Sequence, residues 1–340
     1  MVKINDRSLK ALLKEDFECD RFEGISKEFV GSYLQTENPD NKFIQSLLKS
    51  LTGTAGSTSP EWLDQFLIMI DKLQSYETLL YSMRGYRDHI AHAVRVSLLG
   101  YYLMTRPPLK KFIDHSECFQ TEWLFASLFH DICIPLSRLQ DVQSKVGDMM
   151  RSYSGIDFIQ QAEFGINVKV FPEIKKVLHD EGAEFCIDLM QGTTQAEHGA
   201  LGAIVVLHTF HGHLEDSILQ DIVSSISLHD APCSFVFSEN KLAGLLVLSD
   251  ELQEWDRPFI DRASFEKVLR LDFVDLDLSN SSIRARLDYY KTSSIEGYIP
   301  VEVNEIDNFE KKKSNLARMS LPFELLIQTK DRDGKSLVYP

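Results

Sequence analysis

The sequence predicts a mainly α-helical protein that ends in a small α+β region. From about Pro60 to Phe265, apolar residues recur every three or four positions, which is the period of a helix packed on one side. After about Leu271 the period changes to two, which indicates strands. With 44% apolar and 26% charged residues in a chain of 340, a packed core is expected. We therefore expect an N-terminal helical segment over residues 1–59, a helical domain over 60–265 and a small α+β region over 266–340.

The N-terminal part carries short amphipathic stretches, such as Leu9–Leu13 and Phe43–Leu51. It leads into the sequence LTGTAGSTSPEW, in which Ser59 suits a helix cap and Pro60 suits the first helical position. The clearest helical segments of the following domain lie at residues 62–83, 89–104, 122–132, 197–210, 219–230 and 241–255.

The C-terminal region shows two strand pairs with a helix between them. The stretches DFVDLDL and SIRARLDYY (residues 272–278 and 282–290) alternate around the polar turn SNSS. The stretches FELLIQT and KSLVYP flank KDRDG, a sequence suited to a hairpin loop. Residues Phe309–Met319 are expected to form a short helix between the two pairs.

The charge balance and the cysteines limit the classes of protein to which the chain can belong. A net charge of −15, with 51 acidic against 36 basic residues, argues against binding of long nucleic acid. No stretch approaches the ~20 consecutive apolar residues of a membrane span, and the N-terminus lacks the apolar run of a signal peptide. The five cysteines are scattered and show no CxxC spacing. We therefore expect a cytoplasmic protein without a membrane partner, and homo-oligomer formation is left open.

Three His-Asp pairs occur in the chain, and their context singles out His130-Asp131. This pair ends the apolar run WLFASLF, where an unpaired buried carboxylate would be very costly. A metal ion would compensate both side chains at once if it lay near the helix end, where Pro135 discourages regular helix. The alternative is an Asp131 paired with an arginine and a His130 bonded to a carbonyl.

Further residues of metal-ligand type stand in or at the edge of apolar helices. His92 lies in the helix YRDHIAHAVRVSLLGYYL, with His89 on the same face. His198 opens the helix EHGALGAIVVL, His229 ends the helix IVSSISLHD, and Asp250 interrupts the run LAGLLVLSDEL. Imidazole and carboxylate ligands without thiolate suit Mn, Fe, Co, Ni, Zn or Mg. The sequence therefore predicts a site for one or two divalent ions.

In this order, the six residues resemble the ligand pattern of the HD-domain superfamily of metal-dependent phosphohydrolases. That family places a histidine, a His-Asp pair, further histidines in some members and a final aspartate on successive helices. HAVRVSLLGYYL is similar to its first motif, in which an Arg-Val pair follows the ligand histidine, and this selects His92 over His89. FHDICIP resembles the motif HD-I-G-x-P. The resemblance covers about residues 80–255 and implies an HD-type helical bundle.

The resemblance also implies a reaction. Asp131 would bridge two metal ions and take part in catalysis. Arg95 is the other candidate for a catalytic role, on the separate ground that it and Asp88 share the helix face of His92. Either could orient a ligand or contact phosphate, and an ordinary surface ion pair explains them at least as well. The implied substrate is a nucleotide or another small phosphate ester, attacked at phosphorus by a water that the ions activate. The implied ligands are His92, His130, Asp131 and Asp250 for one ion, with His198 and His229 on a second ion or on the phosphate.

Departures from the family pattern leave the reaction open. Cys133 and Ile134 replace the usual Gly and Lys, and the absence of a GYP motif argues against a cyclic-di-GMP phosphodiesterase. Residues 136–196 are long enough for a lid or a specificity insertion. Glu251 and Glu254 are further candidates for groups that orient a ligand. Two alternatives to the hydrolase stay open, namely a non-catalytic ligand-binding or signalling module of the same fold and an HD-type di-iron oxygenase.

Overall fold

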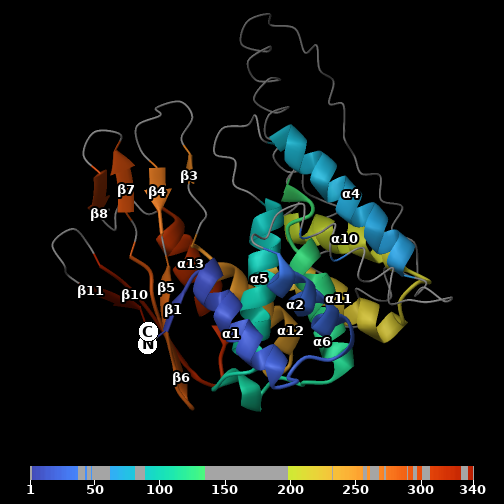
Figure 1. Cartoon of the computed structure of the whole chain (residues 1–340), viewed down its shortest axis with the longest axis horizontal. Coiled ribbons are helices and arrows are strands. Elements are labelled where there is room, and N and C mark those ends of the chain that lie inside the picture. The colour runs from blue at the N-terminus through green and yellow to red at the C-terminus, as the bar shows by residue number, and fades with distance from the viewer. Residues whose placement is uncertain are drawn as a thin grey trace, which may run out of the picture.

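The computed structural model describes residues 2–36, 43, 47, 62–80, 89–134, 198–231, 233–255, 259–260, 268–271, 273–288, 290–293, 297–300, 307–330 and 336–339. In this part of the chain the protein is mainly helical, and its strands lie beside the helices (Figure 1). This arrangement confirms the predicted fold class, a helical body with a small C-terminal strand region. The predicted helix start at Ser59-Pro60, the break at Pro135 and residues 136–196 lie outside the described residues.

The N-terminal part forms a strand and two helices. The strand β1 (Val2–Ile4) is followed by α1 (Asp6–Glu18). A capping box starts α1, because the Asn5 side chain accepts a hydrogen bond from the Ser8 amide and the Ser8 hydroxyl accepts one from the Asn5 amide, each at 3.0 Å. The next helix, α2 (Gly24–Gln35), packs against α1.

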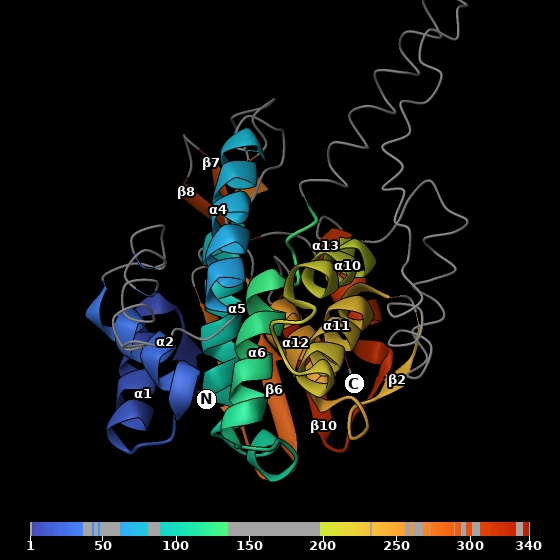
Figure 2. The ribbon, with the colours of Figure 1, turned by 90° about the vertical axis from the view of Figure 1, so that its right-hand side faces the viewer.

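The helical body is built around α5, whose residues are all buried except Arg95. A helix that is apolar on all sides belongs in the centre of a bundle, and α5 packs against α1, α6 and α12. Figure 2 shows α5, α6, α12 and α11 next to one another. The elements of the body are α4 (Leu63–Leu80), α5 (His89–Met104), the 3-10 helix η1 (Leu109–Lys111), α6 (Glu117–Phe129), α10 (His198–Phe210), α11 (Asp216–Asp230) and α12 (Lys241–Leu252).

The close approach of α5 and α6 depends on a glycine. A Cβ atom at Gly100 would lie 1.9 Å from the Trp123 ring, so no other residue fits there without displacing the indole. The Trp123 indole N–H donates to the carbonyl of Ser97 at 3.0 Å, which satisfies its only donor in the core. This contact fixes α5 against α6 along the core.

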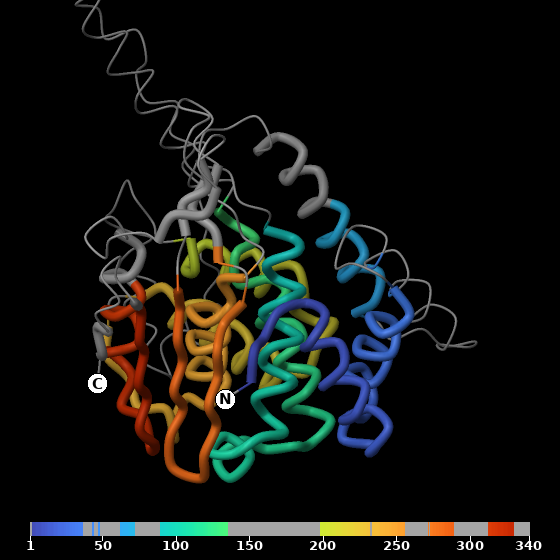
Figure 3. The backbone as a smooth tube through the Cα atoms, turned by 60° about the vertical axis from the view of Figure 1, so that its left-hand side comes forward, coloured from blue at the N-terminus to red at the C-terminus, as the bar shows by residue number. Residues whose placement is uncertain are grey.

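Strands from both ends of the chain form one five-stranded sheet, in the order β1-β5-β6-β10-β11. The strands β5 (Val274–Leu278) and β6 (Ser282–Arg286) form the predicted antiparallel pair around the polar turn. The strand β10 (Glu324–Lys330) pairs in parallel with β6 and antiparallel with β11 (Ser336–Tyr339). Figure 3 shows this sheet on one side of the helices, with both termini beside it.

Shorter elements complete the C-terminal region. The predicted helix forms as α13 (Asp307–Ala317) and leads into β9 (Met319–Ser320), which pairs in parallel with β2 (Phe235–Val236). A separate four-stranded antiparallel sheet contains β3 (Phe259–Ile260), β4 (Val268–Arg270), β7 (Tyr290–Ser293) and β8 (Gly297–Pro300).

Some strands lie where the sequence predicts helix. The strand β1 begins the segment expected to be helical, β2 interrupts the helical domain, and β3 precedes the predicted change of period at Leu271. Each has only two or three residues, which is too short to show a period of two. They are strands because a partner strand pairs with them.

Among the helices of the described ranges, none is long and apolar enough to cross a bilayer.

Candidate metal centre

Four histidines and two aspartates converge at one place in the helical body, close to the ends of several helices. Side chains at helix ends from different elements can face a common point, which side chains in the middle of parallel helices do less easily. The six residues are His92 near the start of α5, His130 and Asp131 directly after α6, His198 at the start of α10, His229 in the last turn of α11 and Asp250 in the last turn of α12.

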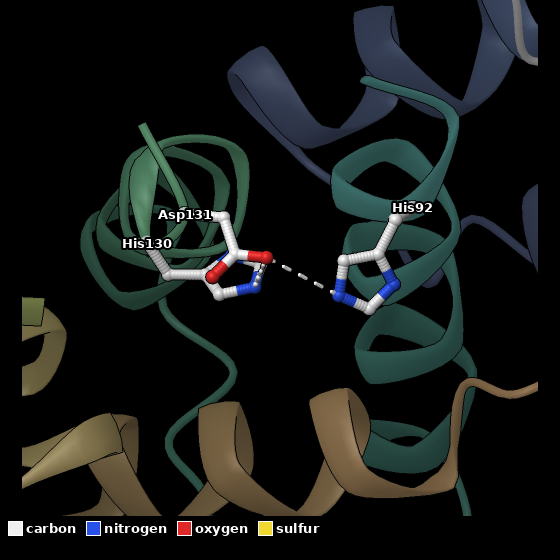
Figure 4. A group of neighbouring side chains, drawn as sticks. All are labelled: His92, His130 and Asp131. Carbon is white, nitrogen blue, oxygen red and sulfur yellow. Dashed lines mark ion pairs between the residues drawn. The ribbon is translucent and has the colours of Figure 1, made fainter. Parts of the chain in front are cut away.

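The first group consists of His92, His130 and Asp131, which face one another in Figure 4. Asp131 Oδ2 lies 3.7 Å from His92 Nε2 and 3.5 Å from His130 Nε2. Asp250 Oδ1 adjoins this group, at 2.8 Å from His92 Nε2 and 3.8 Å from His130 Nε2. Ligand atoms bound at about 2.1 Å to one ion lie roughly 3.0–3.4 Å apart. Asp131 Oδ2 lies slightly beyond this range from the two imidazoles, so a small movement would bring the group to the spacing of one shared ion, with Asp250 beside it.

The second group consists of Asp131, His198 and His229. Asp131 Oδ1 lies 3.3 Å from His198 Nε2 and 3.8 Å from His229 Nε2. In each group the ligand atoms all lie within 4.8 Å of one another. Asp131 therefore belongs to both groups and turns a different oxygen toward each pair of imidazoles.

The orientation of His92 is set by an amide at the end of α12. His92 Nδ1 and Gln253 Oε1 are 2.5 Å apart in a buried hydrogen bond. The Gln253 amide nitrogen donates to the carbonyl of Trp255 at 2.9 Å, so its oxygen is the atom that accepts from His92. His92 Nδ1 therefore donates to Gln253, and Nε2 faces the carboxylates, where it donates to Asp250 Oδ1 at 2.8 Å; a metal ion bound there would take the place of the Nε2 proton.

The other three imidazoles are oriented in the same way, with Nδ1 facing an oxygen and Nε2 facing the cluster. A carbonyl oxygen only accepts, so Nδ1 carries the proton wherever it bonds to a carbonyl. Such outer partners fix both the tautomer and the ring plane of metal-binding histidines. The oxygens are the Ser127 carbonyl for His130 at 2.8 Å, the Ile226 carbonyl for His229 at 2.6 Å, and Asp230 Oδ2 for His198 at 2.8 Å.

The inner nitrogens of two imidazoles are buried and lack a hydrogen bond. Within the described ranges, neither His130 Nε2 nor His229 Nε2 has a hydrogen-bond partner. A buried polar atom without a partner costs free energy on the order of 1–3 kcal/mol. A divalent ion in each group would give both nitrogens a partner, so the residues present fit a pair of metal ions.

The carboxylates and imidazoles also shift one another's pKa values. Burial would lower the pKa of His198, but Asp131 and Asp230 outweigh it and raise the pKa to about 10. Burial also opposes the charged form of His130, and Asp131 and Asp250 again raise its pKa. Burial would raise the pKa of both Asp131 and Asp250, but the surrounding imidazoles hold each well below its ordinary value. The cluster thus attracts positive charge, whether as protons or as metal ions.

The second group depends on a glycine at the start of α10. A Cβ atom at Gly199 would lie 2.8 Å from the Ile226 carbonyl oxygen and 2.9 Å from His229 Cε1. Real Cβ atoms do not approach other atoms so closely. One of the contacted atoms belongs to the backbone of α11, which cannot move aside as easily as a side chain. Glycine at this position therefore allows α10 to approach α11 at the His229 ring.

Arg95, the remaining residue predicted to act on substrate, binds an aspartate of α1. Its Nε lies 3.0 Å from Asp6 Oδ1, and its Nη2 lies 3.0 Å from Asp6 Oδ2. The Trp255 indole donates to the same Asp6 Oδ1 at 2.8 Å. The structure therefore shows the ion pair that the sequence left open, and a phosphate contact by Arg95 stays a prediction. Its neighbour Asp88 lies outside the described residues.

The glutamates that follow Asp250 hold a lysine. Glu251 and Glu254 bind Lys312 of α13, at 3.0 and 2.9 Å, and a role for them in orienting a metal ligand stays a prediction. The residue that orients an imidazole is Gln253, which the sequence analysis missed. Gln253 follows Asp250 by three residues, a spacing that places two side chains on one side of a helix and so could have identified it.

Comparison with known proteins returned no match. No family model, no curated protein sequence and no solved structure is similar to this chain. The functional argument therefore rests on the residues and their geometry.

Proposed function

We propose that this protein is a metal-dependent phosphohydrolase with two adjacent divalent ions, acting on a nucleotide or another small phosphate ester. The observation that carries the proposal is the position of Asp131. Its Oδ2 lies near the imidazoles of the first group and its Oδ1 near those of the second, as expected for a carboxylate that bridges two ions. The order of the ligands along the chain, which resembles the HD-domain superfamily, supports the same assignment.

Two ions held in this way would lower the pKa of a shared water for attack at phosphorus and stabilise the charge that develops on the phosphoryl oxygens. The chain's own residues prepare the site for this chemistry. The four imidazoles turn their Nε2 atoms toward the cluster, because their Nδ1 atoms face fixed oxygens. Asp131 and Asp250 stay ionised, since the imidazoles around them hold their pKa values low.

The surrounding basic side chains support a substrate that is bound through metal. Near the cluster, Arg95 is engaged with Asp6, Lys312 with two glutamates, and Arg318 with main-chain carbonyls at the end of α11. The chain also carries a net charge of −15, which repels a phosphate. Bound divalent ions would supply the local positive charge that such a substrate needs.

The test combines metal analysis with an assay of phosphate release. Protein purified without chelator should hold about two ions of Mn, Fe or Co per chain, and the double variant His130→Ala with Asp131→Ala should hold none. Loaded with each metal in turn, the wild-type protein should release phosphate from one class in a panel of nucleotides and simple phosphate esters. The matched control is His115→Ala, which removes a histidine from the connection before α6 and should retain both properties.

The outcomes distinguish the alternatives. A chain that binds no divalent ion would contradict the proposal and the oxygenase alternative together. Two bound ions with oxygen consumption by the iron-loaded protein, and no phosphate release, would replace the hydrolase with an oxygenase. Two bound ions without turnover on any substrate would instead identify a binding or signalling module.

A further inference from the structure

A segment of the C-terminal region packs against the helix ends that carry metal-ligand residues. We call residues 307–320, which comprise α13, Arg318 and β9, the C-terminal clasp. Its helix α13 packs against α12 and, in Figure 1, lies between the strands and the helical body. Among the side chains of this segment that the structure describes, at residues 312–320, none belongs to the metal cluster. The clasp nevertheless reaches the ends of α11 and α12, next to His229 and Asp250.

At the end of α12 the contact is a buried group of charges. Lys312 Nζ lies 3.0 Å from Glu251 Oε2 and 2.9 Å from Glu254 Oε1, and it donates to the Glu251 carbonyl at 3.0 Å. Asn315 donates to the other carboxylate oxygen of Glu251. Lys312 and both glutamates are less than one-tenth exposed. Removing one partner of a buried pair leaves an uncompensated charge. This contact therefore holds α13 firmly against the end of α12, next to Asp250.

At the end of α11 the contact is a single arginine on the main chain. Arg318 Nη1 donates to the carbonyls of Leu228, at 2.9 Å, and Ala231, and Nη2 donates to the carbonyl of His229. Carbonyls at the C-terminus of a helix lack intrahelical partners, and the cation lies at the negative end of the helix dipole. Arg318 Nε donates to the Asn315 carbonyl at 3.1 Å, which ties the same guanidinium back to α13.

The connection that follows α11 is held by the clasp as well. The amide of Phe235 donates to the carbonyl of Arg318, and the amide of Phe237 donates to the carbonyl of Ser320, both at 3.1 Å. These bonds form the β2–β9 pair. The chain from the last turn of α11 to β2 is therefore bonded to the clasp at both its beginning and its end.

We propose that Arg318 is a positioning residue for the second metal position, and that the clasp sets the affinity of that position for its ion. This inference rests on the proposed metal centre. The His229 imidazole is bonded to the Ile226 carbonyl within the last turn of α11, and Asp230 of the same turn faces His198. Both imidazoles of the second position thus depend on where Arg318 holds the end of α11.

The first position does not depend on Arg318. His92 and His130 come from α5 and the end of α6, and Asp250 lies in the last turn of α12, whose end is held by Lys312; none of these helix ends is bound by Arg318. A change at Arg318 should therefore alter the affinity for the second ion and leave the affinity for the first unchanged. Because coupling between two sites is reciprocal, binding of the second ion must also stabilise the clasp.

The experiment titrates metal-free full-length protein with Mn²⁺ by calorimetry and counts bound ions by elemental analysis. The variants are Arg318→Gln, Arg318→Lys and, as a control, Arg284→Gln, which removes a half-exposed arginine from β6 in the same region. Arg318→Gln should keep the affinity for the first ion and weaken the second about 10- to 100-fold, the usual effect of losing an outer-shell partner. Arg318→Lys should recover part of this loss, since an ammonium still donates to the carbonyls, and Arg284→Gln should change neither ion.

Each other result has a defined meaning. An unchanged second ion in Arg318→Gln overturns the inference, as does equal weakening of both ions. A wild-type protein that binds no Mn²⁺ contradicts the proposed metal centre itself. Should Arg318→Gln fail to fold, hydrogen exchange of the wild-type protein decides the question. The second equivalent of Mn²⁺ must slow amide exchange in residues 307–320, and unchanged exchange there overturns the inference.

Discussion

The two metal positions share Asp131 but differ in how their imidazoles are supported. The His92 and His130 side chains of the first position are 1% and 0% exposed, and they come from helices that pack directly on one another. In the second position the His198 side chain is 20% exposed and stands at the first residue of α10. Both imidazoles of the first position are thus enclosed in the core, whereas the second position pairs the buried His229 with the partly exposed His198. We expect the first to bind its ion more tightly, because a preorganised site loses less conformational entropy on binding.

The largest expected effect follows from removing the side chain that both positions share. Asp131→Asn keeps the volume of the residue but removes the charge from both groups, so neither ion should remain bound after dialysis. Elemental analysis would show a fall from about two ions per chain to nearly none. The control Asp114→Asn alters an exposed carboxylate before α6 that caps Ser116, and it should retain both ions. Two ions in Asp131→Asn would show that this carboxylate is not the bridge.

Loss of a single imidazole should weaken the binding of one ion and leave the other bound. His198→Gln should lose the second ion and keep the first, whereas His130→Gln should weaken the first, because each nitrogen faces only one group. The expected loss is at least about 100-fold in affinity for the ion concerned, more than an outer-shell change produces. Competition with a chelator measures both constants. If His198→Gln released both ions to the same extent, the two positions would not be independent.

A smaller effect is expected from crowding the second position. Gly199→Ala places a methyl group 2.9 Å from the His229 ring, so the ring must move and the second ion should bind about 10-fold more weakly. Gly202→Ala, one turn further along α10, is the matched control, since its nearest contacts are at 3.4 Å. Mn²⁺ titration of both variants should show a change only in the first of them. Equal affinities would mean that the ring relaxes without cost.

The pH dependence gives a further test, in which the expected change in affinity is about tenfold for each pH unit. His198 has a pKa raised to about 10, so at pH 7 its imidazole holds a proton that the second ion must displace. A group with a raised pKa favours the protonated state below that value. Affinity for the second ion should therefore rise by about tenfold per pH unit between pH 6 and 8. Calorimetry in two buffers of different ionisation enthalpy should detect about one released proton, and a second-ion affinity independent of pH would contradict the assignment.

The ligand-type residues were predictable because each stands where an apolar helix disfavours it. His130, Asp131 and Asp250 directly follow the apolar runs WLFASLF and LAGLLVLS, where a buried polar group needs a partner. This need can be recognised in the sequence itself. Their mutual distances were not predictable, since His92 and Asp250 are 158 residues apart and meet only after folding. Asp230 shows the same limit. It neighbours His229 in sequence, yet the imidazole it faces is that of His198.

The helices, α13 included, were predictable from their period. The shortest strands and the tertiary contacts of the clasp were not. In the sequence, Lys312 and Arg318 look like basic residues of an exposed helix, because nothing nearby in the chain indicates burial. Lys312 is buried against Glu251 and Arg318 is half-buried against the end of α11, and these partners lie 61 residues or more away in the sequence. The structure therefore shows which distant residues these side chains contact, and that both contacts lie at the helix ends next to the metal cluster.

The pairing of β1 with β5 has a consequence for how the protein is made. Val2–Ile4 is synthesised well before its partner Val274–Leu278, because about 270 residues separate them in the sequence. At about 5–20 residues per second, this delay lasts on the order of tens of seconds. Throughout that time the β1 segment is present without its neighbour in the sheet, so the nascent chain carries an unpaired strand segment until β5 has been synthesised.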